Sequence, residues 1–180
     1  MHRTEFVLAG SGGQGLVMMG ILLGQAASAD GHHVAQTQTY GIATRGGVSY
    51  SEVVISDEAI VYPKTTDPDL ILTLTEETYH LFRNKYPEAP IVADDEEFAL
   101  SPTADMHTIS MPLTRYCREK GDMRILNMLA IGVVQGIRDV VSEGTMERMI
   151  AERFPKAKQA NLDAYHKGIA MAVQARGELK

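Results

Sequence analysis

The chain has 180 residues, a length that suits one domain with a full hydrophobic core, so we expect residues 1–180 to form a single domain. Its net charge of −6 argues against general affinity for nucleic acids, which requires a basic surface. One cysteine, Cys117, can form no disulfide within the chain and can hold neither an iron–sulfur cluster nor a cysteine-type zinc site alone. The low cysteine content, the lack of a signal-peptide pattern and the lack of a long apolar run predict a cytoplasmic protein that binds no membrane.

The chain opens with the pattern of a strand, a glycine-rich loop and a helix. An apolar strand is expected over residues 5–9, and a helix that is apolar on nearly every face over residues 15–29. The loop that joins them contains Gly10, Ser11, Gly12, Gly13, Gln14 and Gly15. Three of its glycines match the G-x-G-x-x-G spacing of dinucleotide-binding folds. Gly20 and Gly24 each cost the helix about 1 kcal/mol relative to alanine, so we expect this side of the helix to pack closely against a sheet.

Strands and helices alternate through the middle of the chain, and helices follow towards its end. Further strands are expected over residues 33–37, 48–55, 60–62, 69–74, 90–93 and 107–111. Further helices are expected over residues 75–84, 113–119, 125–141, 145–154 and 158–176. In the third strand, Tyr50, Glu52 and Val54 alternate with their neighbours and predict a partly exposed face.

This alternation predicts an α/β protein: a three-layer α/β/α sandwich with a mainly parallel sheet and a Rossmann-like first βαβ unit. The right-handed crossover rule places the glycine loop at the carboxyl end of the first strand, and open α/β sheets bind their ligands at that edge. A phosphate can bind at such a turn because glycines let the backbone approach it and free N–H groups point outward from the helix N-terminus.

A dinucleotide site needs a second feature, an acidic residue about 20 residues further on that binds the ribose hydroxyls. The second strand ends in the run from Ala35 to Thr39, which contains no acid and no arginine, and Asp30 belongs to the end of the preceding helix. The pattern therefore argues against a nicotinamide or flavin dinucleotide. Three interpretations of the loop remain open: a turn that only packs helix against strand, a contact with a ligand, and a contact with a partner subunit.

A second glycine-rich loop follows the second strand. It contains Tyr40, Gly41, Arg45, Gly46 and Gly47. Three glycines around one arginine predict an irregular backbone held close to another surface. Arg45 is suited to bind a phosphate or a carboxylate through two hydrogen bonds, and is equally suited to lie exposed in a flexible loop.

Three motifs, in order along the chain, resemble the gamma subunit of the 2-oxoacid:ferredoxin oxidoreductases. They are Gly10-x-Gly12-Gly13-Gln14-Gly15, Tyr40-Gly41-x-x-x-Arg45-Gly46-Gly47, and the run from Ser51 to Ile60. Tyr62-Pro63 and the helix that contains Asn127 to Gly132 are also similar to that family, and the resemblance is strongest over residues 5–63. It implies the gamma-domain fold of the pyruvate–ferredoxin oxidoreductases and a subunit that is not a self-sufficient enzyme.

Enzymes of that family decarboxylate a 2-oxoacid on thiamine diphosphate, pass electrons through iron–sulfur clusters to ferredoxin, and transfer the acyl group to coenzyme A. The resemblance implies that thiamine diphosphate, Mg, the clusters and coenzyme A belong to the whole complex, and that this chain alone binds none of them. It also implies alpha, beta and delta-type subunits as partners, with ferredoxin reached through the complex. The residues of the two glycine loops are the candidates for contact with a ligand or another subunit. No catalytic or metal-ligating residue is expected, because the six histidines show no zinc-ligand spacing and Cys117 has no evident histidine partner.

The resemblance favours 2-oxoglutarate as the substrate, because Tyr40-Gly41 and Tyr62-Pro63 look like the 2-oxoglutarate and branched-chain oxoacid branches. A branched-chain 2-oxoacid or pyruvate enzyme is the alternative within the family. Two alternatives have other roles: a free-standing Rossmann-like nucleotide-binding or regulatory module, which only the first loop supports, and a scaffold subunit with no ligand contact.

Overall fold

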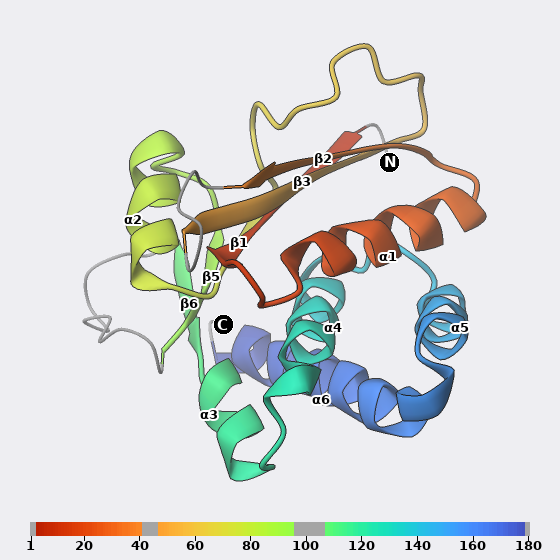
Figure 1. Ribbon diagram of the computed structural model, residues 1–180. Helices are drawn as coiled ribbons and strands as arrows, with labels where there is room; N and C mark the ends of the chain where they lie inside the picture. Colours follow the sequence, from red (N-terminus) through yellow and green to blue (C-terminus); the bar gives the residue numbers. More distant parts are fainter. Residues whose placement is uncertain (1–2, 41–46, 96–106, 179–180) are drawn as a thin grey trace.

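The computed structural model describes residues 3–40, 47–95 and 107–178, which form a sheet with helices on both faces (Figure 1). The strands are β1 (Arg3–Ser11), β2 (His33–Tyr40), β3 (Val48–Ser56), β4 (Leu70–Thr73), β5 (Ile91–Asp94) and β6 (Thr108–Met111). The helices are α1 (Leu16–Ala29), α2 (Glu76–Lys85), α3 (Leu113–Glu119), α4 (Leu126–Arg138), α5 (Glu143–Arg153) and α6 (Lys158–Glu178). Short 3-10 turns, Met123–Ile125 and Pro155–Ala157, precede α4 and α6.

Within the described residues the sheet has six strands in the order β2-β3-β1-β4-β5-β6. The four strands from β1 to β6 in this order are parallel neighbours, whereas β3 pairs antiparallel with both β1 and β2. All strands except β3 therefore run in one direction, which confirms the mainly parallel sheet. The first βαβ unit is present, but β3 lies between its two strands, β1 and β2, so they are not adjacent.

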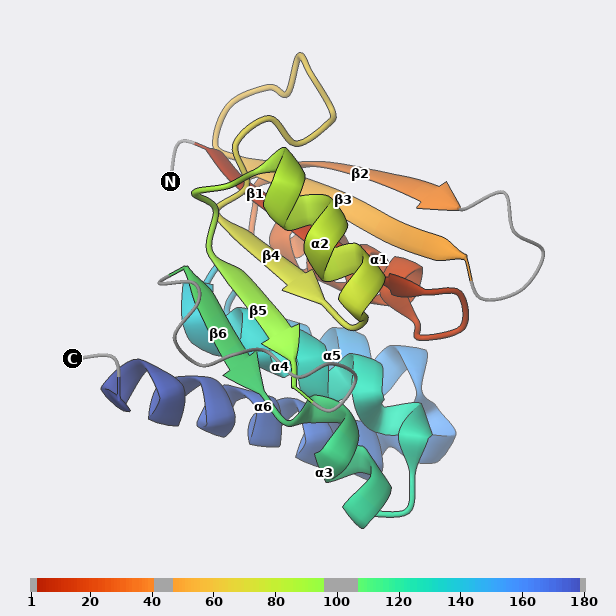
Figure 2. The same ribbon diagram turned by 90° about the vertical axis from the view of Figure 1, so that its left-hand side faces the viewer.

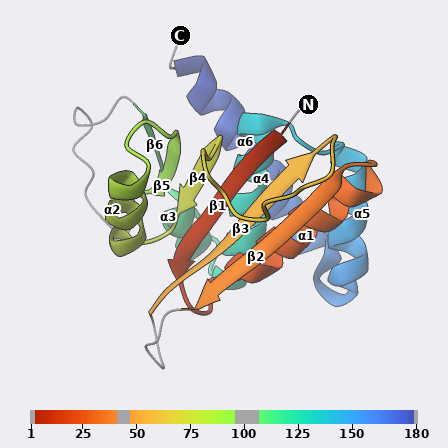
Figure 3. The same cartoon turned by 90° about the horizontal axis from the view of Figure 1, so that it is seen from above.

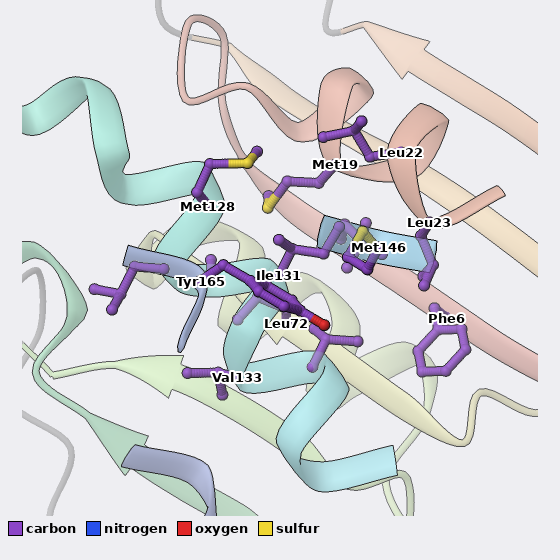
Figure 4. Close-up of a cluster of buried hydrophobic side chains, with 14 of the residues drawn as sticks. Phe6, Met19, Leu22, Leu23, Leu72, Met128, Ile131, Val133, Met146 and Tyr165 are labelled. Carbon is purple, nitrogen blue, oxygen red and sulfur yellow. The ribbon is translucent and has the colours of Figure 1, made fainter. Parts of the chain in front are cut away.

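The two faces of the sheet are covered unequally. Helices α1 and α4 pack on one face, with α5 and α6 beyond them, while α2 lies on the other face (Figures 1 and 2). The larger cluster of buried apolar side chains fills the space between the sheet and the four helices, as the close-up of Phe6, Leu72, Ile131 and Met146 shows (Figure 4). A smaller cluster lies under α2. Helix layers on both faces confirm the α/β/α sandwich.

Helix α1 packs directly on the sheet through its two glycines, as expected. A side chain at Gly20 would collide with Ser51 of β3, and one at Gly24 would come within 3.1 Å of Val34 Cγ1 in β2. The helix ends at Asp30, and Gly31 follows it with a φ of 95°, a left-handed conformation that favours glycine. The glycines lower the helix propensity of α1, and close packing of the helix on β2 and β3 offsets this loss.

The face of β3 that alternation predicts to be partly exposed is partly exposed only at Tyr50 and is buried beyond it. Glu52 is 3% exposed and Val54 is fully buried, because the segment of residues 57–69 crosses β1 and β3 on the face away from α1 (Figure 3). The strand predicted over residues 60–62 is wrong, since the whole segment contains neither strand nor helix. Its polar groups are bound by side chains from the sheet instead of by a strand ladder. We call residues 57–69 the covering segment.

Helices α4 and α6 cross at glycines. A side chain at Gly132 would collide with the carbonyl of Tyr165 and lie 2.9 Å from its carbonyl carbon. A side chain at Gly168 would lie 2.8 Å from the backbone nitrogen of Val133. The backbones can approach this closely only because neither glycine carries a side chain. In the described part of the chain, no helix is long and apolar enough to cross a bilayer.

Candidate functional site

The first glycine loop lies at the carboxyl end of β1, where it turns into α1 (Figure 1). Gly13 and Gly15 have φ angles of 95° and 79°, which L side chains rarely adopt, and Gly15 is the N-cap of α1. No side chain caps this helix. The Gln14 side chain folds back, and its Oε1 accepts a hydrogen bond from the Ser11 N–H at 2.7 Å. The loop therefore satisfies part of its own backbone.

The four glycines of this loop have different structural roles. A side chain at Gly10 would collide with Gln14, and one at Gly15 would lie 2.7 Å from Asn127 Nδ2 on α4. By contrast, side chains at Gly12 and Gly13 would have no neighbour within 4 Å. Gly12 also has no left-handed φ. Packing explains Gly10 and Gly15, and conformation explains Gly13, whereas the fold of the described residues gives no reason for a glycine at Gly12.

The tertiary structure brings Gly47, the last residue of the second glycine loop, beside the first loop. Ser11 at the end of β1 is paired with Val48 at the start of β3, and the Gly12 N–H donates to the Gly47 carbonyl at 3.4 Å. Tyr40 is the last residue of β2. The other candidate residues of the second loop, Gly41, Arg45 and Gly46, lie outside the described residues.

A pocket of about 210 Å³ opens beside the first loop. It is lined by Gly13, Gln14, Gly15, Thr114, Met123, Arg124, Leu126 and Asn127. Arg124 pairs with Asp122 through two hydrogen bonds of 2.8 Å, and this lowers the pKa of that carboxyl to about 2. Small-molecule sites enclose about 300–1,000 Å³, so this pocket suits one chemical group of a ligand or a side chain of a partner.

The geometry argues against a dinucleotide site. In such folds the ribose is bound at the end of the strand next to β1. Here that neighbour is β3, which runs antiparallel and begins, rather than ends, beside the loop. Gln14 in addition covers Gly10, where the backbone would have to approach a diphosphate.

Cys117 is not a reactive thiol in this fold. It is fully buried on α3, and burial, helped by the charges of Asp94 and Asp122, raises its pKa to about 11. A protonated, buried thiol is neither a nucleophile nor a metal ligand. Since the chain has no other cysteine, its residues do not fit an iron–sulfur cluster.

Some charged groups come together only in the tertiary structure. Glu143 and Glu147 on α5 approach His166 on α6, and the candidate ligand atoms of the three residues lie within 4.8 Å of one another. The 2.7 Å contact between His166 Nε2 and Glu147 Oε1 accounts for this cluster as a polar contact between helices. Buried Asp94 accepts hydrogen bonds from the N–H and hydroxyl of Thr114 at the start of α3. No spacing within the sequence indicates these contacts.

Comparison with known proteins places the chain in a family. The profile of the pyruvate ferredoxin/flavodoxin oxidoreductase family matches residues 5–171. The chain belongs to this family. A relative, the 2-oxoglutarate synthase subunit KorC of Methanocaldococcus jannaschii, is 36% identical over 94% of this chain and 94% of its own length. The ketoisovalerate oxidoreductase subunit VorA of Methanothermobacter marburgensis is 33% identical over 76% of this chain but only 29% of its own length.

A solved structure of the same type supports this assignment. The keto/oxoacid ferredoxin oxidoreductase gamma subunit from Geobacter sulfurreducens has the same fold, with a TM-score of 0.84 and 29% identity. The match covers 97% of this chain and 99% of that subunit. The predicted resemblance to the gamma subunits of the oxidoreductase family is thereby confirmed.

Proposed function

We propose that the chain is the gamma subunit of a 2-oxoglutarate:ferredoxin oxidoreductase, which decarboxylates 2-oxoglutarate oxidatively to an acyl-coenzyme A. The observation that carries the proposal is the match to KorC along nearly the whole of both chains. The match to VorA covers less of this chain and less than a third of VorA, so a branched-chain substrate is the second candidate.

The chain contributes to this reaction as part of a complex. Its one thiol is buried and protonated, and the described residues form no nucleophile–base pair around it. Thiamine diphosphate, Mg and the iron–sulfur clusters, which supply the decarboxylation and electron-transfer chemistry, are held by alpha, beta and delta-type subunits in this proposal. Ferredoxin is reached through those subunits.

The edge formed by the two glycine loops is the part of this chain proposed to meet a ligand or a partner subunit. Gly12 and Gly13 are exposed there and leave room for close approach, and the uncapped N-terminus of α1 offers N–H groups to an anion. Tyr40, which ends β2, and Gly47, which binds Gly12, lie at this edge, and we include Gly41, Arg45 and Gly46 among the candidate contacts because they lie between these two residues in the sequence. The 210 Å³ pocket suits a single anionic group, such as a phosphate of coenzyme A, or a side chain of another subunit.

Reconstitution tests the function. The chain would be co-expressed with the other subunits encoded in the same genome, and substrate-dependent reduction of ferredoxin would be measured with 2-oxoglutarate, 2-oxoisovalerate and pyruvate. We expect activity to require this chain and coenzyme A, and to be highest with 2-oxoglutarate. Full activity without this chain contradicts the proposed role, and a preference for another oxoacid contradicts the proposed substrate.

Two alanine variants test the glycine-loop edge. Gly12→Ala meets no atom within 4 Å, so we expect the isolated chain to keep its stability while the complex loses assembly or coenzyme A affinity. Gly144→Ala, in equally open space on α5, is the matched control and should change neither the assembly of the complex nor its affinity for coenzyme A. A Gly12→Ala complex with unaltered assembly and an unaltered KM for coenzyme A removes the edge from the proposal. Micromolar binding of NAD to the isolated chain, measured by calorimetry, would favour the nucleotide-binding alternative.

A further inference from the structure

The covering segment carries two apolar side chains that project into solvent. Val61 is 96% exposed and Tyr62 is 53% exposed, and they are adjacent in sequence. The segment extends away from the sheet at the end opposite the first glycine loop (Figures 1 and 2). This position follows from the pairing of Arg3, at the start of β1, with Ser56, at the end of β3. We call Val61 and Tyr62 the apolar tip.

A buried carboxylate on β3 holds the second half of the segment. Glu52 is 3% exposed and accepts hydrogen bonds from Thr65 Oγ1 at 2.5 Å and from Thr37 Oγ1 on β2 at 3.1 Å. The Tyr86 hydroxyl donates to the Thr65 carbonyl at 3.2 Å. Thr65 itself is 6% exposed. One residue close to the tip is therefore fixed to the sheet and to the end of α2.

A second carboxylate, on β1, holds the residues that follow. Glu5 accepts hydrogen bonds from the backbone N–H groups of Thr66, at 2.5 Å, and Asp67, at 2.9 Å. Arg3 pairs with Glu5 and donates through Nη2 to the carbonyls of Tyr62, at 3.2 Å, and Lys64, at 3.1 Å. The backbone of the tip is thus bound directly by a side chain of the first strand.

These contacts order the backbone that carries the exposed apolar side chains, from the Tyr62 carbonyl to Asp67. Ordering a loop backbone costs about 1–2 kcal/mol of conformational free energy per residue. An exposed valine buries no apolar surface within the chain, so it does not offset this cost. A tip that is already ordered loses little further entropy when a partner covers it. Tyrosine is one of the residues enriched at the energetic centres of protein interfaces.

We propose that the apolar tip inserts into an apolar recess on another subunit of the same enzyme. This inference rests on the proposed function, because only a subunit of a complex has such a partner. VorA supports this occupant: the region similar to this chain is 29% of VorA's length, whereas the match covers 94% of KorC. When the domain is a separate chain, an interface must hold what the longer polypeptide joins covalently. The tip lies at the other end of the sheet from the first glycine loop, so it is a contact separate from the one proposed for the glycine-loop edge.

Matched valine variants test the proposal in the complete complex. Val61→Asp and Tyr62→Ala remove the tip, and Val173→Asp places the same charge at a valine that is 59% exposed on α6. Binding of the purified chain to the remaining subunits would be measured by interferometry and by size-exclusion chromatography with light scattering. We expect Val61→Asp and Tyr62→Ala each to weaken binding at least about tenfold, while Val173→Asp leaves it unchanged. The melting temperatures of all three isolated variants should equal that of the wild type, since none of the side chains is buried.

Each outcome decides between defined explanations. Wild-type affinity for Val61→Asp and Tyr62→Ala overturns the proposal while leaving the function intact. Equal losses for Val61→Asp and Val173→Asp also overturn it, since any surface charge would then suffice. A dimer of the isolated chain that Val61→Asp dissociates shows that the tip pairs two copies, which overturns a heterologous partner. Failure of the wild-type chain to bind the other subunits overturns the proposed function together with this inference.

Discussion

Substitution of Gly132 by alanine should destabilise the fold through the crossing of α4 and α6. The added methyl group would meet the backbone of Tyr165, at its carbonyl oxygen and at 2.9 Å from its carbonyl carbon. Backbone atoms cannot move aside by changing a rotamer, so the two helices must separate. The apolar cluster on both sides of the crossing, which includes Leu129 and Val133, would then lose close packing.

The size of the effect follows from two opposing contributions. Overpacking of a core costs about 1–3 kcal/mol, and contact with a backbone carbonyl places this case at the upper end. Alanine regains about 1 kcal/mol of helix propensity relative to glycine. We expect a net loss of about 2 kcal/mol in the free energy of unfolding, which corresponds to a fall in melting temperature of roughly 4–8 °C for a chain of this length.

Urea unfolding followed by circular dichroism, with calorimetry as a second measurement, would test this value. Gly144→Ala is the matched control, because the same substitution on α5 meets no atom within 4 Å and should be neutral or stabilising by up to about 1 kcal/mol. Gly168→Ala should resemble Gly132→Ala, since it faces the backbone of α4. A Gly132→Ala protein as stable as Gly144→Ala would refute the close helix crossing.

Three further predictions concern charged groups and the thiol. Asp30→Ala removes the acceptor of the Ser142 N–H and hydroxyl that ties α1 to α5, and should cost roughly 1–2 kcal/mol in urea unfolding, whereas the exposed Asp163→Ala should cost little. Burial raises the pKa of Glu5, but hydrogen bonds outweigh burial and hold that pKa below 4.5. The ionised Glu5 carboxylate therefore contributes its full stabilisation of the fold above pH 4.5, and this contribution is lost as the pH falls through the folded-state pKa. Glu5→Gln should reduce the loss of stability at acid pH, and an unchanged loss would count against Glu5 as the group that holds the covering segment. Cys117 should resist a thiol reagent at pH 8 and react on unfolding; rapid labelling of the native protein would contradict its burial.

Local rules account for the parts of the fold that the sequence alone predicts. Thr75 caps α2 by accepting a hydrogen bond from the Thr78 N–H, and Gly31 ends α1 with a positive φ, as their residue types indicate. The apolar run that forms β4 is buried on both faces, as a central parallel strand should be. For the cap and the helix end, the deciding interactions lie within a few residues of one another, and the prediction of β4 needs only the apolar run of the strand itself.

The candidate site could be predicted only in part. The motif order identified the first glycine loop and the family, but the G-x-G-x-x-G spacing does not distinguish glycines that serve packing from one that leaves open surface. That distinction depends on Asn127, more than 100 residues away on α4, which faces Gly15 but not Gly12. The neighbour of Gly12, the Gly47 carbonyl, is likewise set by the pairing of β1 with β3.

The sequence by itself determined the α/β class, the position of the glycine loop between strand and helix, and the gamma-subunit family, because these depend on local periodicity and on ordered motifs. Only the tertiary structure decided that β3 lies between β1 and β2, and that a segment without regular structure covers Glu52. Alternation along a strand reports which side chains share a face, but what covers that face depends on residues far away in the chain. For the same reason, the ordered and exposed Val61 and Tyr62 become visible only once Glu5 and Glu52 are seen to hold the segment that carries them.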